Sequence, residues 1–237
     1  MSQVVEAVVG GDRRALARLL SSIEAGHPDG TVAVEALEAS SPAAHRIGVT
    51  GPPGAGKSTL VSSLVEELRK RDSTVSILAV DPSSPVTGGA LLGDRIRMQD
   101  HIDDPDVFIR SMSSRGHLGG LAEAAALAIR AMSHAGFDYV IVETVGVGQS
   151  EVEVMDLVDL VVLVLTPGWG DQIQAEKAGI VEIADIFVIN KGDRPGVEDL
   201  QLALGQSLGD GAGPILVTTA TMGEGVVALA DAIAEAL

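Results

Sequence analysis

Short apolar runs alternate with segments of helical periodicity along most of the chain. The run Leu160–Leu165 contains no polar residue. Wholly apolar runs of this kind are typical of strands in a parallel sheet that is covered on both faces. The predicted strands are 47–49, 74–80, 108–110, 139–143, 160–165, 186–189 and 215–218, and the predicted helices are 57–70, 121–135, 172–184, 197–204 and 223–236. This alternation predicts an α/β fold with a mostly parallel, doubly wound sheet and right-handed crossovers.

Residues 1–45 precede this alternating region and do not resemble part of the sheet. The segment 12–23 carries leucines and an isoleucine at helical spacing, and it is followed by a predicted turn at His27–Gly30 and a short helix at 32–39. We expect a helical arm over 1–45, beside one domain over 46–237. Two arrangements of the arm stay open at this stage: packed on the domain, or partly mobile.

The stretch Arg46–Leu60, which reads RIGVTGPPGAGKSTL, carries the strongest chemical signal. It has the full G-x-x-x-x-G-K-S spacing of a phosphate-binding loop, with a strand before it and a helix after it. Its glycines allow backbone N–H groups to converge on phosphate, and the following helix adds its positive end. The Lys57 ammonium would contact the β- and γ-phosphates, and the Ser58 hydroxyl would contact Mg²⁺. The predicted nucleotide-binding residues of this loop are Gly51, Pro52, Pro53, Gly54, Ala55, Gly56, Lys57, Ser58 and Thr59.

Composition narrows the class of protein further. The 237 residues include 46% hydrophobic residues, enough for one α/β domain with a sizeable core. The formal net charge of −17 argues against nucleic-acid and anionic-membrane partners, and no apolar run reaches membrane-spanning length. The chain contains no cysteine, so thiolate metal sites are excluded, and its N-terminus lacks the pattern of a signal peptide. We therefore expect a cytoplasmic protein.

Asn190-Lys191-Gly192-Asp193 follows a late predicted strand and fits the N-K-x-D motif of guanine recognition. A carboxylate at Asp193 can accept hydrogen bonds from N1–H and the exocyclic amine of guanine, a donor pair that adenine lacks. Asn190 and Lys191 would brace the loops and pack against the base. The alternative interpretation is a solvated turn that carries two charges. We assign Thr219 and Ala220, which follow the last predicted strand, to the same nucleotide site.

Three acidic residues are candidates for a magnesium site. Glu143 ends a buried strand and would hold Mg²⁺ through water; otherwise it is a strand-end carboxylate bonded to loop amides. Asp81 also ends a strand, where ligands of open parallel sheets bind. Asp81 and Asp94 are candidates either as Mg²⁺ ligands or as helix caps. Gly146, just after Glu143, could offer its N–H to a γ-phosphate.

Two other polar residues carry weaker signals on their own. His117 lies in a glycine-rich loop, where a lone histidine is more often structural than catalytic. Lys177 lies in a predicted helix, and a lysine at such a position is most often solvated.

Several stretches together resemble one family: GPPGAGKST, VDPSSPVTGGALLGDRIRM, FIRSMSSRGHLGGL, ETVGVGQSE, PGWGDQIQAEKAG and NKGD. They are similar to the MeaB/ArgK/MMAA group of G proteins, the GTPase chaperones of adenosylcobalamin-dependent acyl-CoA mutases. The resemblance implies a P-loop G domain of the SIMIBI class, with Asp81, Asp94 and Glu143 around the metal. It also implies a first switch that contains Asp94, a second switch at Gly146–Gln149, and a third switch that contains Asp171 and Lys177.

The resemblance further implies a biological role. Such proteins hydrolyse GTP slowly alone and faster when bound to the mutase, and they gate cofactor loading and the release of damaged cofactor. The implied partners are the mutase and its adenosyltransferase. The family's members usually continue into a C-terminal helical extension that makes a homodimer, and the printed sequence ends at Leu237 without that extension.

Two alternatives come from different functional classes. A P-loop kinase would phosphorylate another molecule, but the guanine motif disfavours it because most such kinases use ATP. A metallochaperone GTPase that delivers nickel is disfavoured because the chain lacks cysteine and a His-rich tract.

Overall fold

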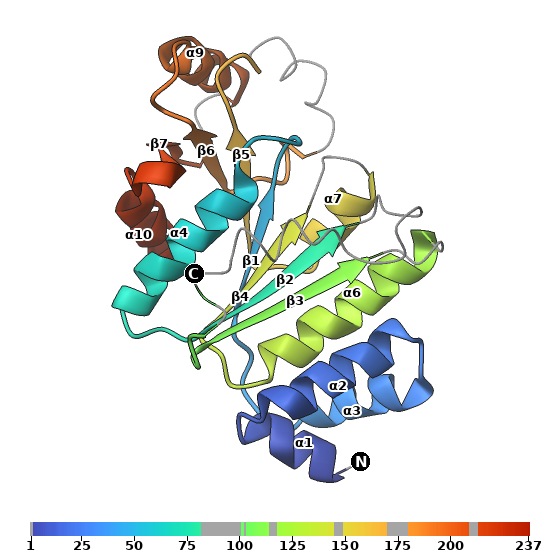
Figure 1. Cartoon of the computed structure of the whole chain (residues 1–237). Helices are drawn as coiled ribbons and strands as arrows, with labels where there is room; N and C mark the ends of the chain where they lie inside the picture. Colours follow the sequence, from blue (N-terminus) through green and yellow to red (C-terminus); the bar gives the residue numbers. More distant parts are fainter. Residues whose placement is uncertain are drawn as a thin grey trace.

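The protein is described by a computed structural model that covers residues 2–81, 101, 103–113, 118–144, 149–169, 180–208 and 213–237. Within these residues, one sheet of parallel strands has the order β3-β2-β4-β1-β5-β6-β7 (Figure 1). The strands are β1 (His45–Thr50), β2 (Val75–Asp81), β3 (Val107–Ser113), β4 (Tyr139–Thr144), β5 (Leu160–Leu165), β6 (Ile186–Asn190) and β7 (Ile215–Thr218). The α/β fold with a parallel, doubly wound sheet is confirmed.

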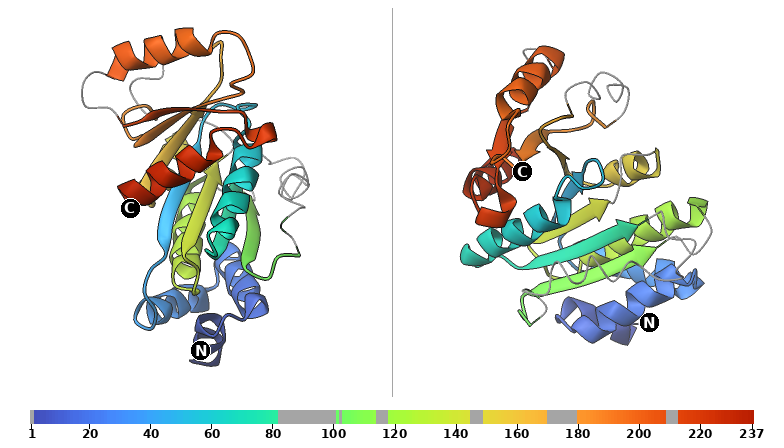
Figure 2. Two further views of the ribbon diagram at one scale, coloured as in Figure 1. Left: turned by 90° about the vertical axis from the view of Figure 1, so that its left-hand side faces the viewer. Right: turned by 45° about the horizontal axis from the view of Figure 1, so that its top comes forward.

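Helices cover both faces of the sheet (Figure 2). One face packs against α4 (Lys57–Lys70) and α10 (Val226–Ala236), and the other packs against α6 (Leu118–Ser133) and α7 (Gln149–Met155). Helix α9 (Val197–Leu208) covers β6, and the short 3₁₀ helix η2 (Ala220–Met222) lies between β7 and α10. None of the helices in the described ranges is long and apolar enough to cross a membrane.

The alternation of side chains along β4 decides where its terminal acid points. Ile141 packs in the core beneath α4, whereas Val140 and Val142 pack in the core beneath α6. Because successive strand residues face opposite sides of a sheet, Glu143 belongs to the α4 face and Thr144 to the other. This places the Glu143 carboxylate beside the first turn of α4.

The N-terminal arm consists of α1 (Ser2–Val9), α2 (Arg13–Glu24) and α3 (Pro28–Glu38). Asp12 caps α2 by accepting hydrogen bonds from the backbone N–H groups of Ala15 and Arg14, and these bonds lower the pKa of the Asp12 carboxyl. Leucines of α2 and α3 are buried in the same hydrophobic cluster as α6 and the sheet. Arg130 of α6 also donates hydrogen bonds of 2.6 and 2.8 Å to the Glu38 carboxylate. The arm therefore shares a core with the sheet.

The predicted turn at His27–Gly30 is wrong. Pro28 is the first residue of α3, where its fixed φ and missing N–H suit a helix start. Gly30 lies inside α3. A Cβ at this residue would come within 2.9 Å of Ile23 Cγ1, so the close contact with α2 requires a glycine here. The glycine therefore allows α2 and α3 to approach closely, and it does not mark a turn.

Other boundaries also differ from the predicted ones. Helix α1 lies in a stretch for which no helix was predicted. Strand β3 is longer than the predicted 108–110, and α6 begins before the predicted residue 121. Residues 180–183 form turns, where the end of a helix was expected. Thr144 and Gln149 were expected in a turn, but Thr144 is the last residue of β4 and Gln149 is the first residue of α7; residues 145–148 lie outside the described ranges. Gly48 explains how α7 approaches the sheet, since a Cβ at this residue would lie 2.4 Å from Met155 Sδ.

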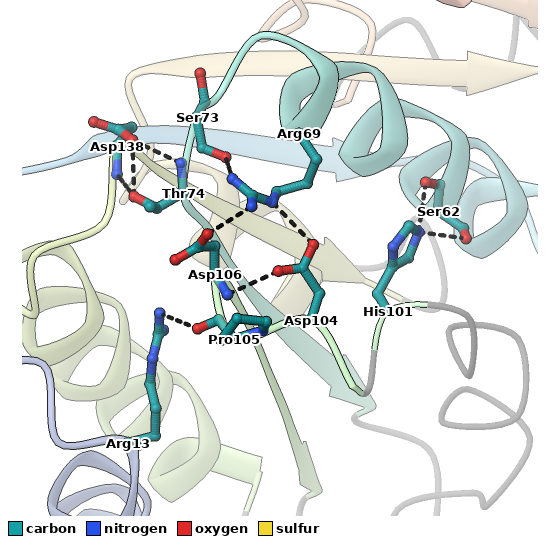
Figure 3. Close-up of polar contacts among 10 residues, drawn as sticks. All are labelled: Arg13, Ser62, Arg69, Ser73, Thr74, His101, Asp104, Pro105, Asp106 and Asp138. Carbon is teal, nitrogen blue, oxygen red and sulfur yellow. Dashed lines mark hydrogen bonds and ion pairs between the residues drawn. The ribbon is translucent and has the colours of Figure 1, made fainter.

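Arg69, near the end of α4, ties together the loops at the amino-terminal edge of the sheet (Figure 3). Its guanidinium donates to the Asp104 carboxylate at 3.0 Å, to the Asp106 carboxylate at 2.6 Å and to the Ser73 carbonyl oxygen at 2.9 Å. The backbone N–H of Asp106 and the Arg69 side chain hold the pKa of the Asp104 carboxyl below its usual value. This network fixes the end of α4 that lies away from the phosphate loop.

We predict that Leu20→Ala in α2 destabilises the whole chain by about 2–5 kcal/mol, because Leu20 is fully buried in the core that the arm shares with the sheet. The measurement is chemical unfolding followed by far-UV circular dichroism. Leu202→Ala, at a leucine of α9 that is 63% exposed, is the matched control and should change stability little. A separate early transition in Leu20→Ala, with the main transition unchanged, would contradict the shared core.

Candidate functional site

The phosphate loop lies at the carboxyl-terminal edge of the sheet, between central strand β1 and helix α4. Strand β1 has β4 on one side and β5 on the other, so the strand order reverses here. Ligands of open parallel sheets bind at such a switch point, outside the carboxyl ends of the strands. The predicted loop therefore occupies the position where this fold binds ligands.

At two positions of the loop, both the backbone conformation and a close contact with a neighbouring segment require glycine. Gly51 has a φ of +143°, and a Cβ there would lie 2.1 Å from the backbone oxygen of Val164 in β5. Gly56 has a φ of +91°, and a Cβ there would lie 2.5 Å from Asn190 Nδ2. The loop is thus wedged between β5 and the Asn190 side chain, so its shape depends on both neighbours.

Lys57 is folded back over the loop that precedes it. Its Nζ donates hydrogen bonds to the backbone oxygens of Gly51, at 2.6 Å, and Pro52, at 3.0 Å. The residue is only 6% exposed. This geometry holds an ammonium group within the concavity of the loop, next to the first turn of α4.

Ser58 and Glu143 meet beside the loop. Ser58 Oγ donates a 2.6 Å hydrogen bond to Glu143 Oε1, and both residues are buried. A serine hydroxyl and a carboxylate are oxygen donors, the type that Mg²⁺ prefers, so the chemistry of this pair fits a magnesium ion that keeps several of its waters. Within the described ranges, no group of three or more His, Asp or Glu side chains lies close enough together to hold a metal ion.

The buried Asn190 side chain links three segments. Its Nδ2 donates to the Ala55 carbonyl oxygen at 3.0 Å, and its Oδ1 accepts from Thr218 Oγ1 at 3.2 Å and from the Ala220 backbone N–H at 3.1 Å. The phosphate loop, the end of β7 and the turn after β7 are therefore bonded to the amide group of Asn190, at the end of β6.

The rest of the N-K-x-D segment lies against the same loop. Lys191 has a φ of +60°, and its Nζ donates a 2.6 Å hydrogen bond to the Gly54 carbonyl oxygen. The Gly192 backbone N–H donates to the Thr218 carbonyl oxygen at 2.9 Å. Asp193 is exposed, so its carboxylate is accessible to a ligand.

The structure brings together most of the predicted site residues but does not describe all of them. The phosphate loop, Glu143 and the two segments at Asn190–Asp193 and Thr219–Ala220 lie at one edge of the sheet. Asp81 is the last residue of β2, which pairs with β4. The remaining predicted residues lie outside the described ranges: Asp94, Gly146, Asp171, Lys177 and the structural candidate His117.

Sequence reasoning missed a second polar pair next to the site. Thr144 Oγ1 donates a 3.1 Å hydrogen bond to Thr50 Oγ1, and both threonines are fully buried. They end the adjacent strands β4 and β1, on the face opposite Glu143. Side chains alternate between the two faces along β4, and this alternation could have predicted that Thr144 points to the face opposite Glu143.

The parallel sheet and the loop at its switch point define a P-loop nucleoside triphosphatase. Comparison with solved structures agrees. The crystal structure of an LAO/AO transport system kinase has a TM-score of 0.76 and 28% identity, and the match covers 99% of this chain and 74% of that one. Nickel-bound HypB from Helicobacter pylori, with a TM-score of 0.60, 14% identity and coverage of 91% and 94%, shares the fold.

Sequence comparison identifies the family. The family described as methylmalonyl-CoA mutase-associated GTPase MeaB matches residues 16–237. A Pyrococcus horikoshii protein named as a GTPase is 48% identical over 244 residues, which cover 99% of this chain and 77% of the relative. The GTPase ArgK of Escherichia coli is 45% identical over 187 residues, which cover 77% of this chain and 56% of ArgK. The chain belongs to the MeaB family of GTPases; it binds guanine nucleotide and hydrolyses GTP.

We predict that Gly51→Ala lowers both stability and nucleotide affinity, because the new Cβ would collide with the Val164 backbone. The loss of GDP affinity should be at least roughly tenfold, since N–H groups that must converge on phosphate would be displaced. Gly54→Ala is the matched control: Gly54 also has a positive φ, of +78°, but nothing lies within 4 Å of its Cβ position. Calorimetric titration with GDP checks the result, and equal affinities in the two variants would contradict it.

Proposed function

We propose that this GTPase requires Mg²⁺ and acts as a chaperone of an adenosylcobalamin-dependent acyl-CoA mutase, gating cofactor loading and the release of damaged cofactor. The observation that carries the nucleotide part is the Asn190 side chain, which bonds the guanine motif to the phosphate loop. The mutase part is supported by the family's description as associated with methylmalonyl-CoA mutase.

The base would lie beside the Asn190–Asp193 segment, with Thr219 and Ala220 on its other side. The exposed Asp193 carboxylate would accept hydrogen bonds from N1–H and the exocyclic amine of guanine. Adenine presents no such donor pair, so it would leave the carboxylate unmatched. Lys191, already bonded to Gly54 of the loop, would pack against the base plane.

The phosphates would lie in the loop, between its backbone N–H groups and the Lys57 ammonium. Lys57 would exchange its bonds to the loop carbonyls for bonds to phosphate and stabilise the negative charge that develops on the leaving GDP. Ser58 and Glu143 would hold Mg²⁺ with Asp81 and Asp94, directly or through water. When bound, this ion supplies positive charge that neutralises the phosphate oxygens.

Hydrolysis would proceed by in-line attack of water on the γ-phosphorus. The products are GDP and phosphate, and catalysis depends on positioning and on charge neutralisation. From its place just after Glu143 we assign γ-phosphate sensing to Gly146, and from the family resemblance we assign partner response to Asp171 and Lys177. The intrinsic rate is slow, and binding of the mutase increases it.

A mitochondrial relative supports the mutase role. The mouse methylmalonic aciduria type A homolog is 46% identical over 152 residues, which cover 64% of this chain and 37% of that protein. From the family resemblance, the partners that we propose are an acyl-CoA mutase and its adenosyltransferase, and the location that we propose is the cytoplasm.

Asp193→Asn should weaken GDP binding by roughly ten- to a hundredfold, because hydrogen bonds to a charged acceptor are lost. The same change should improve binding of xanthosine diphosphate, since an amide can donate to the O2 of xanthine. Competition against labelled GDP measures both effects, with ADP as a third competitor. Asp199→Asn, at an exposed aspartate in the first turn of α9, is the control. A protein that binds ADP as well as GDP would instead support a kinase.

Purified methylmalonyl-CoA mutase should increase the steady-state rate of GTP hydrolysis, and Lys177→Ala should reduce this stimulation. Phosphate release measured with and without mutase checks the prediction. Lys57→Ala, which removes the ammonium from the phosphate loop, should abolish turnover in both conditions. The chaperone role is contradicted if the mutase neither binds the GTP-loaded protein nor changes its rate.

A further inference from the structure

Ser63 joins α4 to the turn after β7, although it belongs to neither nucleotide motif. Its Oγ lies 2.8 Å from the Ala220 carbonyl oxygen and 3.1 Å from the Thr59 carbonyl oxygen, one helical turn back. Serine in a helix commonly bonds the carbonyl four residues earlier. Here the shorter contact is with Ala220, which lies outside the helix and 157 residues further along the chain.

Ala220 is therefore held at both of its backbone polar groups. Its N–H donates to Asn190 Oδ1 at 3.1 Å, and its carbonyl oxygen accepts from Ser63 Oγ at 2.8 Å and from the Gly223 backbone N–H at 3.3 Å. The bond from Asn190 Nδ2 to the Ala55 carbonyl oxygen continues the series back to the phosphate loop. Because the loop leads directly into α4, the phosphate loop, Asn190, Ala220 and α4 form a closed ring of contacts.

The contact lies at the wall of a groove of about 730 Å³ along α4. Thr59, Ser62 and Ser63 line one side of this groove, and Ala220 and Thr221 line another. Water in the groove can replace the Ser63 hydroxyl as a donor to Ala220. Loss of the hydroxyl would therefore loosen the turn without leaving a buried carbonyl oxygen unsatisfied.

We propose that Ser63 is a positioning residue for guanine recognition. By fixing the Ala220 carbonyl oxygen to α4, Ser63 holds the Thr219–Thr221 turn in register with Asn190, and this sets how long a guanine nucleotide stays bound. The inference rests on the proposed placement of the base beside Asn190 and Asp193. It concerns residence time and affinity, since the Ser63 hydroxyl bonds the backbone oxygens of Ala220 and Thr59, so its effect on the groups assigned to the phosphates and the metal is indirect.

Ser62 provides a matched control in the same helix. It is the preceding residue, it is also partly buried, and it lines the same groove. Its Oγ lies 3.1 Å from His101 Nε2, and its carbonyl oxygen lies 3.0 Å from the same nitrogen (Figure 3). Removal of the Ser62 hydroxyl thus removes one side-chain contact of α4 but leaves the turn after β7 bonded.

The experiment measures dissociation of fluorescent GDP by stopped flow, together with GTP turnover at saturating substrate. Ser63→Ala should release GDP roughly three- to tenfold faster, which is the effect of one hydrogen bond on an equilibrium, and should raise KM while kcat changes less than about twofold. Ser62→Ala should release GDP at the wild-type rate. Ser63→Thr, which keeps a hydroxyl, should also stay near wild type.

The proposal is overturned if Ser63→Ala releases GDP at the wild-type rate, or if Ser62→Ala accelerates release equally. If Ser63→Ala melts well below the wild type, the release rates of Ser63→Thr and Ser63→Val are compared instead. These two side chains have the same shape, and only threonine carries a hydroxyl. Equal release rates in this pair overturn the proposal. Asp193→Asn separates the two levels of inference. A loss of guanine preference in that variant, with Ser63→Ala unaffected, refutes the role of Ser63 alone, whereas an unchanged preference refutes the base placement.

Discussion

The hydrogen bonds of the Asn190 side chain hold the nucleotide site together. One buried amide donates to the phosphate loop and accepts from the last residue of β7 and from the turn that follows it. An amide is suited to this task because it carries a donor and an acceptor at a fixed separation. Gly56 completes the arrangement, since any side chain there would occupy the space of the Asn190 amide. The segments that we propose for phosphate binding and for base binding are therefore positioned by one residue.

The parallel sheet determines which chemistry can meet at this edge. Strands β1, β4, β5 and β6 are neighbours, and their carboxyl ends deliver the phosphate loop, Glu143, Val164 and Asn190 to the same place. Alternation along β4 then sends the Glu143 carboxylate toward Ser58 and the Thr144 hydroxyl toward Thr50. At the opposite edge, the Arg69 network fixes the far end of α4, so the helix that carries Lys57 and Ser58 is held at both ends.

The sequence was informative wherever a pattern has one physical explanation. The apolar runs predicted a parallel sheet because only strands covered on both faces can be apolar throughout, and the spacing around Lys57 predicted the phosphate loop. It was less informative where tertiary packing decides. Pro28 and Gly30 suggested a turn, yet the glycine serves the contact with Ile23 inside a helix. Ser63 carries no sequence signal at all, because its partner is 157 residues away. Asp94, Gly146, Asp171 and Lys177 lie outside the described residues, so their proposed roles rest on the sequence and on the family resemblance.

Calorimetric titration of the wild-type protein with GDP and with ADP, in the presence of Mg²⁺, tests the central claim most directly. If Asn190 and Asp193 form one site with the phosphate loop, GDP should bind at least roughly a hundredfold more tightly than ADP, because adenine leaves the Asp193 carboxylate unmatched. Equal affinity for the two nucleotides, or no measurable binding of GDP, would contradict the account.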